Sequence, residues 1–385
     1  MTRIIEKIKA RRKRYSRAPA SPVSQDDRTK AETIQMPSGW YYSFEFFPPK
    51  TEAGLENLLT RIERMTSRLD PLFVDVTWGS AGSTSARTLA VSSHAQRFCG
   101  VDVLMHLTTT GMSRDQIASV LQQAKSCGIH NILALRGDPP KGKRSWERGD
   151  VSGGECRRAI DLVKLIRELH GDFFGIAVAG HPEGHPSSNS LDEEMKHLKE
   201  KIDAGADFII TQFFYDTDAF LRFVKRCRDC GIDCPIMPGI MPIQSFSSFS
   251  RMTSYCSVAV PKHIMERLEP VKDDDEAVKE IGCDIAAEMC RRILAEGDID
   301  GIHFYTLNLE RSVTRILMTM GAIDYILPVS ASNSAEPESL KMIPRIDVRP
   351  SQEIAESVRP NSERQFPWRP SAMAQRAKEE VRYGY

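Results

Sequence analysis

The sequence predicts an α/β fold, a (β/α)8 TIM barrel with flexible N- and C-terminal tails, and three observations point to it. Strand-like runs and helix-like segments alternate about eight times between residues 36 and 328, and eight parallel strands close such a barrel. The chain of 385 residues has room for one barrel plus tails. A doubly wound open sheet is the competing fold, but neither a second domain nor a glycine fingerprint supports it.

Residues 1–35 are expected to form a basic, disordered N-terminal tail with at most one short helix. The stretch "KIKARRKRYSR" is basic, and "APASPVSQDDRTK" is polar and contains prolines. A weak targeting or docking element is the alternative. Glu6 and the lack of a clean amphipathic stripe argue against a mitochondrial presequence, so a cytoplasmic location is expected.

Residues 329–385 are expected to form a second tail, a linker. The stretch "LPVSASNSAEPESLKMIP" is rich in Ser, Pro and Asn. The rest of the chain, as far as Tyr385, shows no strong hydrophobic period.

The barrel elements follow one another in a regular order. Expected helices include residues 52–65, with Leu and Ile at helical spacing, and the helices that begin with capping boxes at Ser113–Gln116 and Ser190–Glu193. Gly128 is expected to end the first of these two capped helices. The expected strands are YYSFEFF (41–47), LFVDVTW (72–78), DVLMHLT (102–108), NILALRG (131–137), FGIAVAG (174–180), DFIITQFF (207–214), CPIMPGIM (234–241) and GIHFYTLN (301–308).

The bulk composition excludes several classes of function. The formal net charge is zero, so the chain is not built to coat nucleic acid or an acidic membrane. No apolar run of about 18 residues predicts a membrane span. Nine scattered cysteines fit a reducing compartment. Cys227, Cys230 and Cys234 lie close in sequence, but no second ligand pair accompanies them, so neither a metal site nor redox work is expected there.

Glu45 stands out because it is an acid near the end of an aromatic strand, just before two prolines. In barrels of this kind the reactive groups lie at the C-terminal ends of the strands. Side chains alternate along a strand, so Glu45 shares a face with Ser43 and Phe47, while Tyr42, Phe44 and Phe46 face the surrounding helices. Glu45 is therefore expected to point toward the barrel mouth.

The other strand ends also carry polar groups. Burying such groups without partners costs a few kcal/mol each, so they need a ligand, water or one another. They include Thr77, His106, Arg136, Gly137, Asp138, His181, His185, Gln212, Tyr305 and Asn308. Taken singly, most would be structural.

Three familiar chemistries do not fit these strand ends. The stretch "HPEGHP" is not helical, so it lacks zinc-protease geometry, and no G-x-S-x-G elbow is present. "GDPPKGKR" resembles a phosphate loop but has Arg144 in place of Ser or Thr, and its prolines remove backbone donors. The remaining possibility is proton-assisted chemistry on an aromatic or cofactor-bound substrate.

Eight motifs occur in the order of one known family: "FEFFPPK", "DVTWG", "LMHLT", "LALRGDPP", "HPEGHP", "AGADFIITQFF", "PIMPGIMPI" and "HFYTLN", from about Tyr41 to Leu327. The chain resembles the catalytic domain of eukaryotic methylenetetrahydrofolate reductase. The resemblance implies that FAD binds at the barrel mouth and that NADH or NADPH reduces it and leaves. Methylenetetrahydrofolate then takes the same place, and 5-methyltetrahydrofolate is the product.

The resemblance also implies site residues. Glu45 would be the general acid that opens the folate ring, and an aromatic, water-poor wall favours the protonated form of a carboxyl. Asp138, Gln212 and Tyr305 would contact the folate. No metal is expected. The positions that match FAD contacts are Thr77, Trp78, His106, Arg136, Gly137, Asp138, Ala159, His181, His185, Glu194, His197 and Lys201.

The sequence departs from the family pattern in four places. His181 stands where Tyr is usual, Leu309 replaces a frequent Arg, and Glu194 replaces a frequent Asp. Eukaryotic members continue into a regulatory domain that binds S-adenosylmethionine, whereas "FPWRPSAMAQRAKEEVR" resembles only the linker to it, so no complete inhibitor site is expected.

These departures leave some alternatives open. One is a weakly active or inactive paralogue that binds FAD or folate and acts as a partner subunit. Another is a different barrel enzyme that acts on pterins. A homo-oligomer is expected, with neither nucleic acid nor membrane as partner, and the choice between NADH and NADPH stays open.

Overall fold

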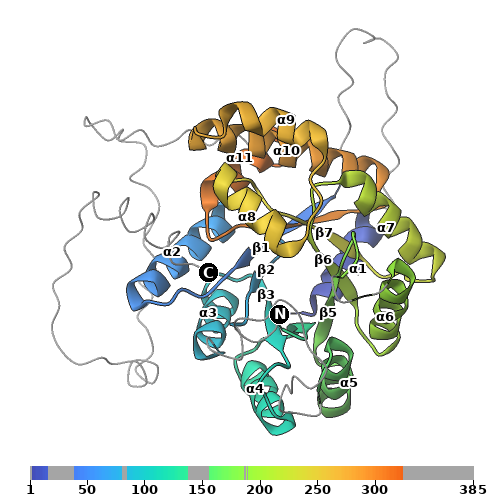
Figure 1. Cartoon of the computed structure of the whole chain (residues 1–385). Helices are drawn as coiled ribbons and strands as arrows, with labels where there is room; N and C mark the ends of the chain where they lie inside the picture. Colours follow the sequence, from blue (N-terminus) through green and yellow to red (C-terminus); the bar gives the residue numbers. More distant parts are fainter. Residues whose placement is uncertain are drawn as a thin grey trace, which may run out of the picture. The chain divides into compact units, whose positions relative to one another are not determined.

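The computed structural model describes residues 2–15, 39–79, 85–137, 156–185, 188 and 190–323. Eight parallel strands form a closed barrel in which each strand pairs with the next and the last pairs with the first. The helices surround it (Figure 1). This confirms the predicted (β/α)8 barrel against the open sheet. The strands are β1 (Tyr41–Phe46), β2 (Phe73–Val76), β3 (Asp102–Thr108), β4 (Asn131–Leu135), β5 (Gly175–Gly180), β6 (Phe208–Phe213), β7 (Ile236–Ile240) and β8 (Gly301–Tyr305).

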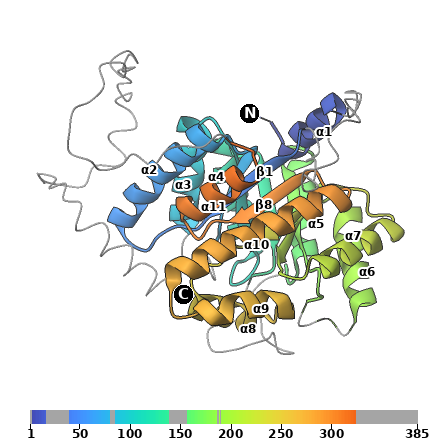
Figure 2. The ribbon, with the colours of Figure 1, turned by 90° about the horizontal axis from the view of Figure 1, so that it is seen from above.

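The helices of the barrel follow their strands in order. They are α2 (Glu52–Leu69), α3 (Ser85–Phe98), α4 (Arg114–Ser126), α5 (Ala159–His170), α6 (Leu191–Asp203), α7 (Thr217–Asp229), α8 (Phe246–Cys256), α9 (Lys262–Leu268), α10 (Asp275–Glu296) and α11 (Glu310–Thr319). Figure 2 shows α10 and α11 side by side on the outside of the barrel. None of the helices in the described ranges has the length and apolar character needed to cross a bilayer.

The predicted helix starts are largely confirmed. At the start of α4, Ser113 and Gln116 form the full capping box, and Gly128 follows the helix with a φ of +77°. At the start of α6, the Ser190 hydroxyl accepts the backbone N–H of Glu193 at 3.1 Å. Each cap satisfies a backbone donor that the first helical turn leaves unpaired.

The alternation predicted for β1 is confirmed. Tyr42, Phe44 and Phe46 belong to the large apolar cluster that also contains Leu58 and Ile62 of α2. On the opposite face, the Ser43 hydroxyl lies 2.8 Å from Nδ1 of His303 on β8. Residues with odd numbers on this strand therefore line the barrel interior, and Glu45 is one of them.

A separate apolar layer fills the barrel at the end where the strands begin. It combines three isoleucines of α1 (Ile4–Tyr15) with inward side chains of the strands. Ile4 and Ile8 are fully buried, and Ile5 is 3% exposed. The strand residues of this layer are Tyr41, Phe73, Leu104, Leu133, Ala177, Phe208, Ile210 and Met237.

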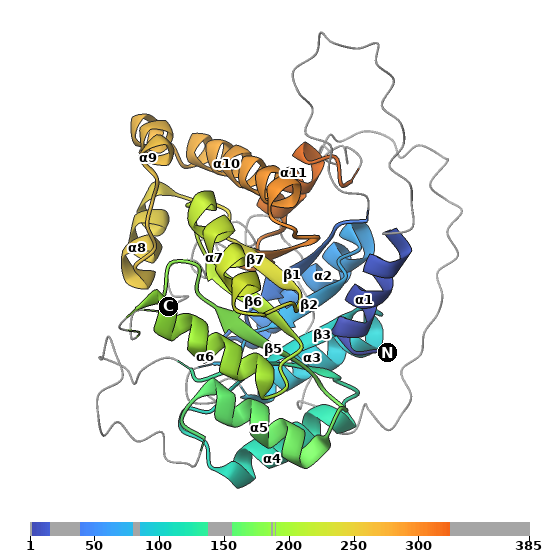
Figure 3. The same cartoon turned by 90° about the vertical axis from the view of Figure 1, so that its right-hand side faces the viewer.

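The expectation of a solvated N-terminal tail is therefore wrong for residues 4–15. The three isoleucines lie at i, i+1 and i+4, which places them on one face of a helix. That face covers apolar side chains that would otherwise meet water at the open end of the barrel. Figure 3 shows α1 at one end of the barrel and α8 at the other. Residues 16–38 and the linker predicted at 329–385 lie outside the described residues.

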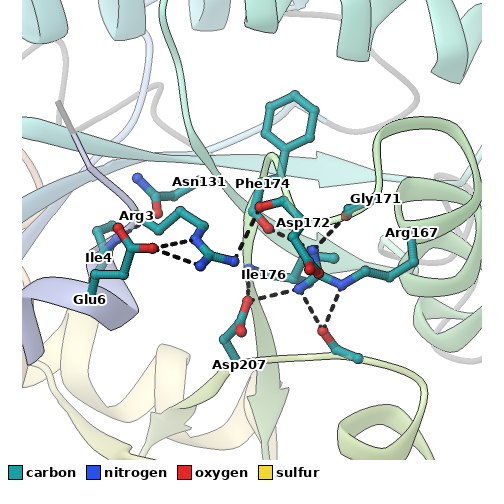
Figure 4. Close-up of polar contacts among 11 residues, drawn as sticks. Arg3, Ile4, Glu6, Asn131, Arg167, Gly171, Asp172, Phe174, Ile176 and Asp207 are labelled. Atoms are coloured by element: carbon teal, nitrogen blue, oxygen red, sulfur yellow. Dashed lines mark hydrogen bonds and ion pairs between the residues drawn. The ribbon is translucent and has the colours of Figure 1, made fainter. Parts of the chain in front are cut away.

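The basic residues of α1 are used to attach it to the barrel. Lys7 Nζ lies 2.5 Å from Asp102 Oδ2 at the start of β3, and the guanidinium of Arg12 binds both carboxylate oxygens of Asp300 at 2.6 and 2.8 Å. The backbone N–H of Ile4 donates to the Asn131 side chain at 2.7 Å (Figure 4). Lys7 and Arg12 of this basic segment thus make ion pairs within the chain.

Candidate active site

The Glu45 carboxyl lies inside the mouth of the barrel, as predicted. Its side chain is 18% exposed, and Oε2 is 3.7 Å from His106 Nε2 and 3.6 Å from His303 Nε2. The strand register explains this position, because Glu45 pairs with Asp75 on β2 and with Tyr305 on β8. An acid at the mouth, partly shielded from water and close to two histidines, is arranged for proton transfer.

Two members of this group were not identified from the sequence. Asp75 and His303 have no exposed surface. Asp75 Oδ2 is 3.4 Å from His106 Nε2, and Asp75 Oδ1 is 3.9 Å from His303 Nδ1. We call Glu45, Asp75, His106 and His303 the Glu45 cluster. The prediction considered only polar residues at strand ends. Asp75 and His303 instead lie at inward positions within apolar strands, and that pattern was the signal in the sequence.

The electrostatics of the two buried members favour bound protons. Burial raises the pKa of Asp75, although the neighbouring histidines oppose the shift. Burial by itself would lower the pKa of His303, but the carboxylates of Asp75 and Glu45 outweigh it, and the His303 pKa is raised. Asp75 and His303 therefore bind protons more tightly than the isolated side chains do.

Three further predicted residues meet on the β5–β6 side of the mouth. His181, His185 and Gln212 line a pocket of about 150 Å³ together with Phe213 and Cys256. The β6–β7 pairing shifts register between Ile210 and Phe213, and such irregularities often redirect a side chain beside an active site. Here the shift falls at Gln212, whose side-chain oxygen accepts the Phe213 N–H at 3.0 Å.

Tyr305 and Asn308 take different roles at the end of β8. The Tyr305 hydroxyl donates to the Thr211 carbonyl at 2.8 Å, and its ring lies edge-on to His303 with centroids 4.9 Å apart. The Asn308 side chain instead bonds the backbone N–H and carbonyl of Phe47 at 3.0 and 2.9 Å. Tyr305 therefore belongs to the mouth, whereas Asn308 ties the end of β1 to the loop after β8.

An ion-pair group on β5 and α6 unites His181, Glu194 and Lys201. Glu194 accepts hydrogen bonds from His181 at 3.0 Å and from Ser188 at 2.8 Å, and Lys201 donates to the Ala179 carbonyl at 2.8 Å. Burial opposes ionisation of Glu194, but His181, Ser188 and Lys201 outweigh it and lower its pKa to about 2.

The neighbours of Glu194 are shifted by the same burial. Burial, reinforced by His181, lowers the pKa of His185 to about 4. Burial also lowers the pKa of Lys201. His197 lies between Glu194 and Lys201 on the same face of α6. This side of the mouth therefore presents a fixed carboxylate next to a neutral imidazole.

The ends of β2 and β3 contain polar atoms that lack partners. Within the described ranges, Trp78 Nε1 and Thr108 Oγ1 are buried without a hydrogen bond. At the end of β4, Gly137 has a φ of +94°, and a Cβ there would lie 2.8 Å from Thr110 Oγ1, so a glycine lets this backbone pack against Thr108 and Thr110. Burial lowers the pKa of Arg136. Buried polar groups without partners, such as Trp78 Nε1 and Thr108 Oγ1, leave hydrogen-bonding capacity for a bound group.

The remaining predicted contacts are placed as follows. The backbone N–H of Thr77 donates to the Phe46 carbonyl at 2.9 Å, which fixes it beside β1 at the mouth. Ala159 is the first residue of α5. Asp138, predicted to contact both flavin and folate, lies outside the described residues.

Glu194→Gln is expected to make the free energy of unfolding less dependent on pH in the acidic range. The pKa of Glu194 is lowered from 4.5 to about 2, so its ionised form contributes stability that is complete above pH 4.5 and is lost as the pH falls toward 2. The shift corresponds to about 3 kcal/mol at neutral pH. Urea unfolding at about pH 6 and about pH 4 measures the free energy of unfolding at each pH. Between these two values it should fall less in the variant than in the parent protein. Asp192→Asn, exposed on the same helix, is the control; equal losses in parent and Glu194→Gln would contradict the assignment.

Comparison with known proteins identifies the family. The family model of methylenetetrahydrofolate reductase matches residues 31–321. The chain belongs to the methylenetetrahydrofolate reductase family. The matched range includes every strand of the barrel and all the site residues described above.

Two curated relatives show how much of the family this chain covers. It is 48% identical over 308 residues to methylenetetrahydrofolate reductase (NADH) 1 of Arabidopsis thaliana, covering 77% of this chain and 51% of that protein. It is 38% identical over 279 residues to 5,10-methylenetetrahydrofolate reductase of Pectobacterium carotovorum, covering 72% of this chain and 89% of that protein. The chain thus spans about half the length of the plant relatives that it matches.

A solved structure agrees with the fold. A protein from Clostridium thermocellum, described as binding two copies of 5-methyl-5,6,7,8-tetrahydrofolic acid, aligns with a TM-score of 0.51 at 16% identity. The alignment covers 74% of this chain and 96% of that protein. At this identity the likeness supports the barrel architecture of the reductase family member and nothing finer.

Proposed function

We propose that this chain reduces 5,10-methylenetetrahydrofolate to 5-methyltetrahydrofolate with NADH or NADPH, using bound FAD and Glu45 as the general acid. The observation that carries the proposal is the Glu45 carboxyl, which points into the barrel mouth within 3.7 Å of two histidines. The reaction consumes a proton at the substrate, and this is the carboxyl placed to deliver it.

The mouth has features that fit FAD. The unpaired donors Trp78 Nε1 and Thr108 Oγ1 need partners, and Lys201 and Arg136 supply positive charge for phosphate groups. When bound, FAD would transfer hydride from the nicotinamide to the folate. In this proposal the chain keeps FAD bound, and the nicotinamide and the folate occupy one place beside it in turn.

Glu45 would begin folate reduction by donating its proton to the bridge nitrogen attached to the aminobenzoyl group. The methylene carbon is a poor hydride acceptor while both of its nitrogens hold it in the ring. Protonation breaks one carbon–nitrogen bond and leaves an electrophilic iminium on the folate. Gln212 and Tyr305 lie around the same mouth, and we assign them to hold the pterin against rotation.

No departure from the family pattern changes Glu45 itself. His181 replaces the usual Tyr and is held by Glu194 at 3.0 Å, so it retains a polar contact in the cofactor region. Leu309 caps the start of α11 in extended conformation, without a side-chain hydrogen bond. We infer that these changes adjust affinity for cofactor or folate and leave the acid in place.

A flavin spectrum tests the proposed function. The purified chain is expected to carry an absorbance band near that of oxidised flavin, to bleach anaerobically with NADH or NADPH, and to recover when methylenetetrahydrofolate is added. Bleaching without recovery would instead indicate a weakly active paralogue. A protein that binds no flavin under any condition would overturn the proposal.

A further inference from the structure

The barrel interior directly below the mouth is charged, although the layer beneath it is entirely apolar. Asp75 and His303 are fully buried there, while the next layer toward α1 consists of side chains such as Phe73 and Leu104. Burying ionisable groups is costly unless they are paired. A barrel of this size is filled well by apolar side chains, so folding alone does not explain the charged layer.

The geometry directs His303 at Glu45. Its Nδ1 is 2.8 Å from the Ser43 hydroxyl, which fixes the ring. Its Nε2 is 3.6 Å from Glu45 Oε2 and makes no hydrogen bond within the described ranges. A proton on Nε2 therefore has the Glu45 carboxyl as its nearest acceptor.

We propose that His303 holds the proton that Glu45 passes to the substrate, and that buried Asp75 is the counter-charge that keeps it there. This rests on the proposed function, because it concerns the acid of that same reaction. Asp75 and His303 act through Glu45 and are positioning residues. The atoms of Glu45, Asp75 and His303 that face one another lie within 4.8 Å.

The proton transfer balances over one turnover. When folate covers the mouth, the Nε2–H bond of His303 breaks as an O–H bond forms on the Glu45 carboxylate. The Glu45 O–H bond then breaks as the substrate N–H bond forms, which leaves a carboxylate again. After product leaves, Glu45, 18% exposed, takes a proton from water and passes it to His303. One proton from water is consumed for each hydride transferred.

The charged groups around His303 determine the direction in which its proton affinity changes in a variant. His303 faces Glu45 from β1, Asp75 from β2 and Tyr305 on its own strand. His106 of β3 lies against the same two carboxylates. Cys256 of α8 acts on Tyr305 from the far side, and burial followed by the two carboxylates raises the pKa of Tyr305, so this phenol stays neutral. Removing the Asp75 charge lowers the proton affinity of His303.

Asp75→Asn is the first test. The rate of flavin reoxidation by methylenetetrahydrofolate is measured by stopped flow over a range of pH. The decline of this rate with rising pH is expected to occur about one pH unit lower in the variant. Flavin reduction by NADH should keep its pH profile. Asp102→Asn is the matched control, because this aspartate is also buried in the neighbouring strand β3 but pairs with Lys7 at the opposite end of the barrel.

His303→Asn is the second test, since the amide preserves a partner for Ser43 but cannot give a proton to Glu45. Folate-dependent reoxidation is expected to slow about tenfold at neutral pH and to recover in mild acid, where water protonates Glu45 directly. A packing defect would not be rescued by acid. The flavin spectrum of each variant reports that it is folded.

A titration provides a readout independent of activity. In histidine-labelled protein, the His303 resonance, assigned by its absence in His303→Asn, should titrate at higher pH in the parent than in Asp75→Asn. Unchanged pH profiles in both variants, together with an unchanged His303 titration in Asp75→Asn, would overturn the proposal while the parent still reduces folate. Failure of the parent to reduce folate would instead overturn the proposed function. A pH profile altered by EDTA would assign the cluster to a cation and also overturn the proposal.

Discussion

Replacing Glu45 by glutamine is expected to slow reduction of methylenetetrahydrofolate by about 10²- to 10⁴-fold, the usual contribution of a general acid. The amide keeps the size and the hydrogen-bonding capacity of the carboxyl but has no acidic proton to donate. Flavin reduction by NADH needs no proton from this position and should continue. Anaerobic stopped-flow absorbance separates the two half-reactions.

The control is a second glutamate–histidine pair. Glu63 of α2 lies 2.8 Å from His94 Nε2 at the surface, so Glu63→Gln makes the same chemical change far from the mouth. Both half-reactions should keep their rates in that variant. If Glu45→Gln slowed both half-reactions equally, Glu45 would be a structural or cofactor-binding residue and no dedicated acid.

Ile8→Ala is expected to lower the free energy of unfolding by about 2–5 kcal/mol, the range measured for large-to-small changes in packed cores. The Ile8 side chain is fully buried in the layer that closes the barrel. The truncation leaves a cavity between α1 and the strands, which relax only partly because eight strands hold one another in place.

Urea denaturation followed by fluorescence or circular dichroism measures this loss. Lys9→Ala is the control, because Lys9 is exposed on the same helix and alanine is an even better helix former. A change below about 0.5 kcal/mol for Ile8→Ala, as is usual for surface positions, would show that α1 does not pack on the barrel in solution.

The barrel was predictable because its signals are local. Strand-like runs such as the one that contains Glu45 show an alternation of side chains that can be recognised within the run itself. Caps such as Ser113 mark helix starts within four residues. The position of Glu45 also followed from local reasoning, since alternation along one strand and the rule that barrel sites lie at C-terminal strand ends were enough.

Asp75 and His303 show what local reasoning missed. Both occupy inward positions within strands, and only the register between β1, β2 and β8 brings them to Glu45. That register depends on closure of the whole sheet. The α1 helix was missed for a related reason: its apolar face is short, and the surface it covers is assembled from strand starts far apart in the sequence.

The layer that α1 completes has a consequence for how a ligand reaches Glu45. The end of the barrel where the strands begin is filled by apolar side chains, so the Glu45 carboxyl is approached from the end where the strands finish. Under the proposed function, nicotinamide and folate would therefore reach the reaction site from the same side of the barrel.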